Sequence, residues 1–162
     1  MAPIARLSKD IKKRSQQVEN AGVRLVRAIG KKALKNLIYA TPVDKGEARS
    51  NWRIGVGGTP TAVISPYSPG RNLGIGERGN ARGAIAAGFA RINSLKPGQG
   101  RRLKTSLVIV NNAKHIGLLN DGRSKQAAPG FIGRAVAASG ASVLPNFKIF
   151  VPSGTTPGED SE

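Results

Sequence analysis

The chain has 162 residues, with 26 Lys and Arg against 9 Asp and Glu, which gives a formal net charge of +17. It has no cysteine and one histidine, so disulfides, cysteine metal sites and thiol nucleophiles are excluded. No apolar run reaches the length of a membrane span, and no apolar segment of a secretory signal follows the first charged residues. We expect one domain over 1–151, then a flexible acidic tail over 152–162, in a protein made in a reducing cytoplasm.

Residues 7–40 are predicted to form a long amphipathic helix. Its apolar stripe repeats every three or four residues and contains Val18, Ala21, Leu25, Ile29, Ala33 and Leu37, with Val26, Leu34 and Ile38 widening it. Lysines and arginines between these positions form a basic outer face. Pro42 ends the helix, because the residue before a proline is biased away from the α conformation.

The segment 41–64 is predicted to reverse the chain and start a sheet. A Pro-x-Asp-x-Gly turn begins at Pro42. Residues 47–52 then predict a short helical turn or the entry to a strand. Two short strands are expected around a Gly-Gly-Thr-Pro turn, at 53–56 and 62–64.

Residues 65–104 are predicted to form a long basic loop insertion, within which 80–95 has some helical spacing. Between positions 71 and 104, eight basic residues face one acid, Glu77. Such a field attracts polyanions, and phosphate contact independent of sequence is the expected mode. The side chains expected to face phosphate are Arg71, Arg78, Arg82, Arg101, Arg102 and Lys104.

The rest of the chain adds strands and a second helix. The aliphatic run 107–110 predicts a strand, and 115–119 is a short apolar patch before a turn. A helix is expected over 131–139 and a final strand over 147–151. The pattern predicts an α+β fold, with a long N-terminal helix packed on a small, mostly antiparallel sheet and a second helix near the C-terminus.

Two patterns of possible chemical interest do not predict a catalytic or cofactor site. Gly74, Gly76 and Gly79 match G-x-G-x-x-G, but prolines replace the strand that a dinucleotide site requires before it. His115 has Asp121 as its nearest acid in sequence, and a lone histidine of this kind is usually structural. We expect no enzyme activity, no cofactor and no metal.

Two segments in order resemble a known family. Residues 41–52 have the sequence TPVDKGEARSNW, and residues 108–131 have VIVNNAKHIGLLNDGRSKQAAPGF. They are similar to the TPVDTG-x-(A/L)-R-x-x-W block, and to the later strand, LE-x-G and S-x-Q-A-P-x-G block, of neck or tail-completion proteins of tailed bacteriophages. The similarity covers 7–56 and 105–139. It departs at His115, where the family has Tyr, among other positions.

The resemblance implies a structural virion protein, made in the host cytoplasm, that forms a closed ring of six or twelve copies at the head–tail junction or tail end. Its implied partners are itself, neighbouring neck, connector and tail proteins and the backbone of the packaged DNA, without a membrane. The motif positions tied to assembly are Pro42, Asp44, Gly46, Arg49, Trp52, Leu118, Leu119, Gly122, Gln126, Pro129 and Phe131. The alternative is a nucleoid or ribosome-associated protein that binds nucleic acid without sequence preference, which the charge alone favours.

Overall fold

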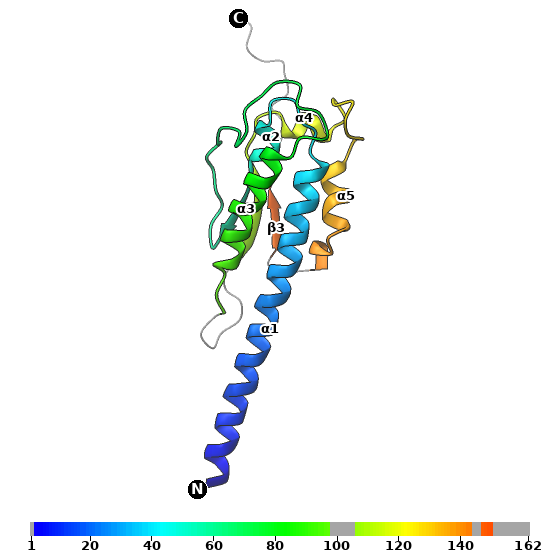
Figure 1. Ribbon diagram of the computed structural model, residues 1–162. Helices are drawn as coiled ribbons and strands as arrows, with labels where there is room; N and C mark the ends of the chain where they lie inside the picture. Colours follow the sequence, from blue (N-terminus) through cyan, green and yellow to red (C-terminus); the bar gives the residue numbers. More distant parts are fainter. Residues whose placement is uncertain (1, 98–105, 144–146, 151–162) are drawn as a thin grey trace, which may run out of the picture.

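The computed structural model describes residues 2–97, 106–143 and 147–150. These residues form an α+β fold, as the sequence predicts (Figure 1). The elements in chain order are α1 (Ala2–Ala40), α2 (Glu47–Ser50), β1 (Trp52–Val56), α3 (Gly79–Asn93), β2 (Leu107–Asn111), α4 (Ile116–Asn120), α5 (Phe131–Ala137), a 3-10 turn η1 (Ala141–Val143) and β3 (Phe147–Phe150). The predicted tail 152–162 lies outside the described residues.

The three strands form a mixed sheet in the order β1-β2-β3. β1 pairs antiparallel with β2, with Trp52 opposite Asn111, whereas β2 pairs parallel with β3, with Ile109 opposite Ile149. The expected antiparallel pairing therefore holds for β1 and β2 but not for β3. The chain passes through α4, α5 and η1 between β2 and β3, and a long crossover of this kind allows the parallel direction.

The predicted strand at 62–64 is wrong, because this segment pairs with a side chain and not with a strand. The backbone N–H of Ile64 donates to Oδ1 of Asn51 at 2.8 Å, and its carbonyl accepts from Nδ2 of Asn51 at 2.9 Å. Both backbone polar groups of Ile64 are thus satisfied without a strand partner.

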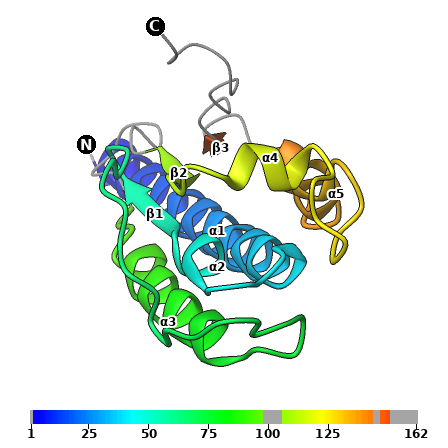
Figure 2. The same ribbon diagram turned by 90° about the horizontal axis from the view of Figure 1, so that it is seen from above.

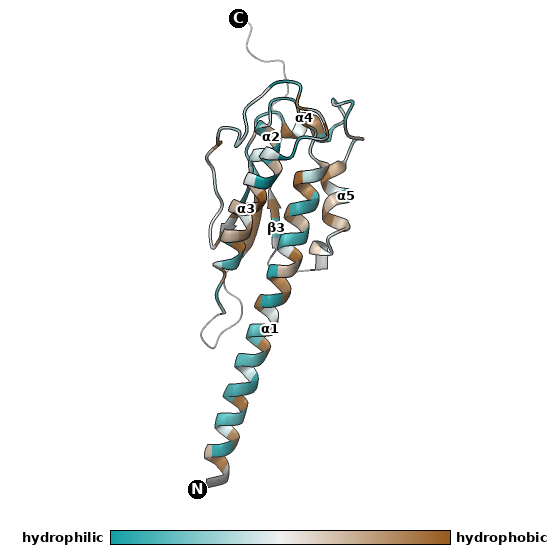
Figure 3. Ribbon diagram, viewed as in Figure 1, coloured by the Kyte–Doolittle hydropathy of each residue, from teal (hydrophilic) through white to brown (hydrophobic). Residues whose placement is uncertain are grey.

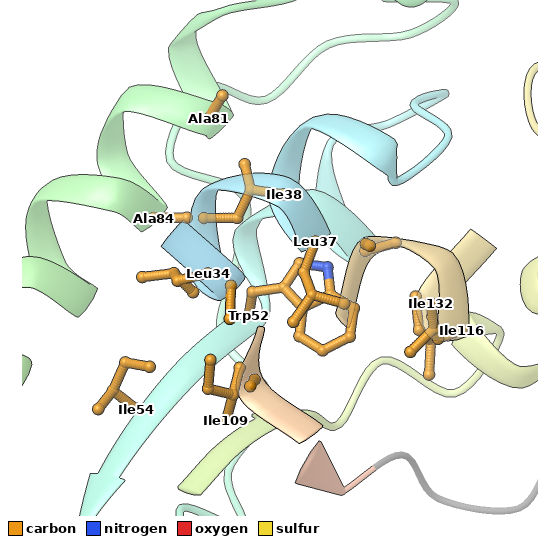
Figure 4. Packing of buried hydrophobic residues seen from close by; sticks show 14 of the residues in the cluster. Leu34, Leu37, Ile38, Trp52, Ile54, Ala81, Ala84, Ile109, Ile116 and Ile132 are labelled. Atoms are coloured by element: carbon orange, nitrogen blue, oxygen red, sulfur yellow. The ribbon is translucent and has the colours of Figure 1, made fainter. Parts of the chain in front are cut away.

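The helices α3, α1 and α5 lie side by side with α1 in the middle, and the sheet lies behind them (Figure 2). Trp52, at the start of β1, is 1% exposed and lies in the middle of the apolar cluster, with Leu37 of α1 and Ile109 of β2 nearby (Figure 4). Burial of these aliphatic and aromatic side chains is the main stabilising term of such a small fold.

The core-facing side of α1 differs from the predicted stripe. Ala33 and Leu37 are buried as expected, but Val18 is 72% exposed and Leu25 is 54% exposed. Leu34 and Ile38, which widen the predicted stripe, are also buried, whereas Val23 is not part of it; the core face begins only at Val23. Before that position α1 projects away from the rest of the protein (Figure 1).

The region predicted as a basic loop insertion contributes α3 to the core. Ile92 and Leu95 are fully buried there. At Gly88 an added Cβ would lie 2.2 Å from a side-chain carbon of Leu34, so the absence of a side chain lets α3 approach α1 closely. The helical spacing at 80–95 is therefore confirmed as α3, where alanines and glycines form a close helix–helix contact, and the description of 65–104 as a loop does not hold for 79–93.

Candidate functional site

The first motif segment forms the connection between α1 and β1, and its two ends are joined by a side-chain hydrogen bond. Nε1 of Trp52 donates to Oγ1 of Thr41 at 2.7 Å, and that hydroxyl donates to the carbonyl of Leu37 at 2.6 Å. All three groups are buried. This bond satisfies the indole N–H inside the core and holds the start of β1 against the end of α1.

Arg49 of the same segment is a buried charge, 1% exposed. Its Nη1 lies 3.6 Å from Oε2 of Glu77 and also donates to the carbonyl of Glu77, while its Nη2 donates to the carbonyl of Thr41 at 3.0 Å. Burial lowers the pKa of Arg49, and the attraction of the Glu77 carboxylate opposes that shift. Arg49 therefore joins the motif turn to the loop before α3 and is not available to a partner.

Asn80, at the start of α3, is a further buried polar residue beside Arg49 and Glu77, and no sequence pattern pointed to it. Its Oδ1 accepts from Oγ of Ser50 at 2.9 Å and from the backbone N–H of Ser68 at 2.8 Å. Its own backbone N–H donates to Oε1 of Glu77 at 2.7 Å. Gly46 lies against this amide, because an added Cβ there would lie 2.2 Å from Nδ2 of Asn80.

The two motif segments meet at Gln126, which lies 83 residues after its partner Val43. Its side-chain Nε2 donates to the carbonyl of Val43 at 2.9 Å, and its Oε1 accepts from the N–H of Val43 at 2.8 Å. One primary amide therefore satisfies both backbone groups of one residue of the first motif. We call this pair of bonds the Gln126 clasp.

The second motif contains the short helices α4 and α5, and contacts of Gly122 and Asn120 fix the connection between them. Gly122 has φ +93°, and a Cβ there would lie 2.6 Å from Cγ of Pro129. Oδ1 of Asn120 accepts from the N–H of Ile132 at 3.1 Å, which ties the end of α4 to the start of α5. The ring of Phe131, in the first turn of α5, is buried.

A groove of about 370 Å³ lies between the two motif segments. Its lining residues are Pro42, Val43, Asp44, Lys45, Gly46, Glu47, Ala48, His115, Leu119, Ser124 and Gln126. Charged, amide and apolar groups thus share one concave surface, which suits a docked polypeptide segment better than a reacting small molecule. In the described part of the chain, no three His, Asp or Glu side chains gather closely enough to hold a metal ion.

The motif positions divide into interior and exterior groups. Pro42, Gly46, Arg49, Trp52 and Phe131 are buried and so act within the fold. Leu118, Leu119 and Gly122 are half-buried, whereas Asp44, Gln126 and Pro129 are exposed. The partly and fully exposed positions are the ones accessible from outside the described fold.

Three of the six residues predicted to face phosphate lie in the described part of the chain. Arg71, Arg78 and Arg82 are exposed, and the last two lie one helical turn apart at the start of α3, where the N–H of Arg82 donates to the carbonyl of Arg78. The described structure thus brings these two arginines together. The other three predicted positions, Arg101, Arg102 and Lys104, lie outside the described residues.

A second hollow, of about 520 Å³, lies between β1, the loop that follows it and α3. Its polar lining includes Arg53, Arg91 and Tyr67. Nη1 of Arg53 donates to the carbonyl of Ala62 at 2.9 Å, so this arginine supports the loop. Sequence reasoning did not point to this hollow, because its lining comes from three segments that the fold brings together.

Comparison with known protein families, curated proteins and solved structures found no match to this chain. Among the described residues, no helix combines the length and apolar character that crossing a bilayer requires.

Proposed function

We propose that the protein is a structural component of a tailed-bacteriophage virion, which forms a closed ring at the head–tail junction and completes the tail around the DNA conduit. The Gln126 clasp carries this proposal. It joins the two segments on which the resemblance to neck proteins rests, so the two motifs behave as one structural unit.

The groove at the clasp supports a role in assembly. In a ring each subunit contacts its neighbours through two different surfaces, of which one must receive the other. The exposed side chains Asp44, Lys45 and Gln126 line this groove together with the half-buried Leu119. Polar and apolar groups that share one accessible surface are the usual composition of a subunit contact.

The charge distribution supports contact with DNA. It is equally compatible with the second candidate function, that of a free nucleic-acid-binding protein. Arg49–Glu77 is the one ion pair within the residues that the structure describes. The exposed basic side chains of α1 and of the α3 start, such as Lys12 and Arg82, therefore have no acidic partner within the described part of the subunit. Phosphate groups are suitable counterions for them, in a conduit or on free nucleic acid.

Electron microscopy of the purified protein, together with DNA binding over a range of salt concentrations, separates the two candidates. The neck role predicts discrete rings in negative stain without added DNA. A monomer that binds duplex DNA tightly, with a steep loss of affinity as salt rises, would instead support the alternative.

Replacing both Arg78 and Arg82 with Gln gives a matched test of the DNA contact. Because both side chains are exposed, the variant is expected to fold and to form rings like the wild type. It should bind duplex DNA more weakly and with a smaller salt dependence. Unchanged DNA affinity would contradict the assignment of phosphate contact to these two arginines.

A further inference from the structure

The N-terminal part of α1 extends from the protein as an isolated helix (Figure 1). Every side chain from Ile4 to Val18 is exposed, and Val23 is the first buried one. At about 1.5 Å per residue, the segment 4–22 is roughly 30 Å long. We call this segment the arm.

Most of the stability of a helix in a protein comes from packing of its apolar face, and the arm has no such contact within the described part of the subunit. Along the arm, apolar bands recur between hydrophilic ones (Figure 3). The large apolar side chains of the stripe and their exposed fractions are Ile4 77%, Leu7 60%, Ile11 59%, Val18 72% and, just beyond the arm, Leu25 54%.

These positions follow a heptad pattern. From Ile4 the steps are three, four, seven and seven residues, so Leu7 occupies a d position and the other four occupy a positions. With 3.6 residues per turn, this stripe lies about a third of a turn away from the core face that contains Val23 and Leu34. The stripe is therefore a second apolar seam and not an extension of the core face.

The charges of the arm are arranged so that a like-charged copy can approach the seam. Within the arm the e and g positions, which flank the seam, hold uncharged or acidic side chains such as Ser8, Asp10, Ser15 and Gln17; the next g position, beside Leu25, is Arg24. The basic side chains at b, c and f, which face away from it, are Arg6, Lys9, Lys12 and Lys13. Arg14, at a d position, is the one basic side chain of the arm in the seam.

Other occupants fit this arrangement less well. An acidic partner would face the basic b, c and f positions, which point away from the apolar stripe. A membrane-surface helix has a broad apolar face with bulky aromatic anchors, whereas this seam is narrow and α1 has no aromatic residue before Tyr39. A second arm matches the heptad, the narrow seam and the neutral flanks together.

We propose that the arm of α1 pairs with the arm of a second copy of this chain, through the seam of Ile4, Leu7, Ile11, Val18 and Leu25. The pairing rests on the heptad and charge pattern and not on the neck role. Subunit contacts at the groove are separate from it.

The test measures the mass distribution of the full-length protein by sedimentation equilibrium over a wide concentration range. The seam variant carries Ile11→Ala and Val18→Ala, and the matched control carries Lys9→Ala and Gln16→Ala on the opposite side. Both pairs are exposed and seven residues apart, and alanine is the best helix former, so neither variant loses the arm by unfolding. We expect at least tenfold weaker self-association for the seam variant alone. Equal self-association of the seam and control variants, or no association of the wild type, would overturn the pairing.

Spin labels give a second readout, because the chain has no native cysteine. A nitroxide on Ile11→Cys should show strong coupling between copies, and one on Gln16→Cys should show weaker coupling. Rings in micrographs without coupling at position 11 would overturn arm pairing and leave the neck proposal intact. Coupling at position 11 in a protein that forms no rings would support arm pairing and contradict the neck proposal.

Discussion

Replacing Glu77 with Gln would leave the Arg49 guanidinium charged inside the protein without its carboxylate. The two side chains are only 2% and 8% exposed, and Nη1 lies 3.6 Å from Oε2. At that distance the gross attraction is about 5 kcal/mol for an effective dielectric constant of ~20. Removing one partner of a buried pair typically costs about 3–5 kcal/mol, because the other charge stays desolvated and uncompensated. We therefore expect Glu77→Gln to lower the free energy of unfolding by about 3 kcal/mol or more.

Urea unfolding followed by circular dichroism measures this loss. Asp121→Asn, an exposed charge after α4, is the matched control and should change the free energy of unfolding by less than about 0.5 kcal/mol. A double-mutant cycle with Arg49→Met measures the coupling free energy between Arg49 and Glu77, apart from the contacts that each makes with other residues. The coupling should reach at least about 1.5 kcal/mol, so that the double variant loses much less than the sum of the single variants. Additive losses, or a Glu77→Gln variant as stable as the control, would refute the role of the buried pair.

Three further changes test the motif surfaces. Gly46→Ala should cost about 2–4 kcal/mol of unfolding free energy, since Gly46 has φ +83° and a Cβ would lie 2.2 Å from a side-chain nitrogen at the start of α3. Gly58→Ala is the control and should be nearly neutral in the same urea assay, because the space around its Cβ is open. Equal losses for the two variants would contradict the strain expected at Gly46. Gln126→Ala removes both bonds of the clasp and should cost about 1–3 kcal/mol by urea unfolding, whereas an unchanged midpoint would mean that water replaces the clasp. Lys45→Glu, at the groove, should reduce ring formation several-fold in negative stain. Lys35 of α1 is also exposed, and Lys35→Glu should leave ring formation unchanged. Intact rings in the Lys45→Glu variant would exclude this side of the groove from the subunit contact.

Local patterns predicted the fold class and several elements from the sequence. The aliphatic run at 107–110 lies within β2, and the segment from Phe131 forms α5. The direction of β3 was not accessible, because it depends on where a chain segment returns after a long crossover. Periodicity found α1 but assigned Val18 to the core, because a helix with two apolar stripes does not reveal which stripe the domain covers.

The site was predicted less completely than the fold. The motif segments do come together, through a glutamine that the resemblance had included. The burial of Arg49 was not expected, since its carboxylate partner is 28 residues later in the chain, in a region predicted to be loop. Asn80 had no sequence signal, because its importance comes from the three segments that it joins. The exposed seam of α1, in contrast, does have a sequence signal, namely the heptad that starts at Ile4.

The proposed neck role is tested most directly by cryo-electron microscopy of purified particles of the tailed phage that the proposal requires, in which the protein is located. The account predicts a closed ring of density at the head–tail junction or tail end, into which this fold fits with the groove at the Gln126 clasp against the adjacent subunit. Absence of the protein from the particles would contradict the central claim.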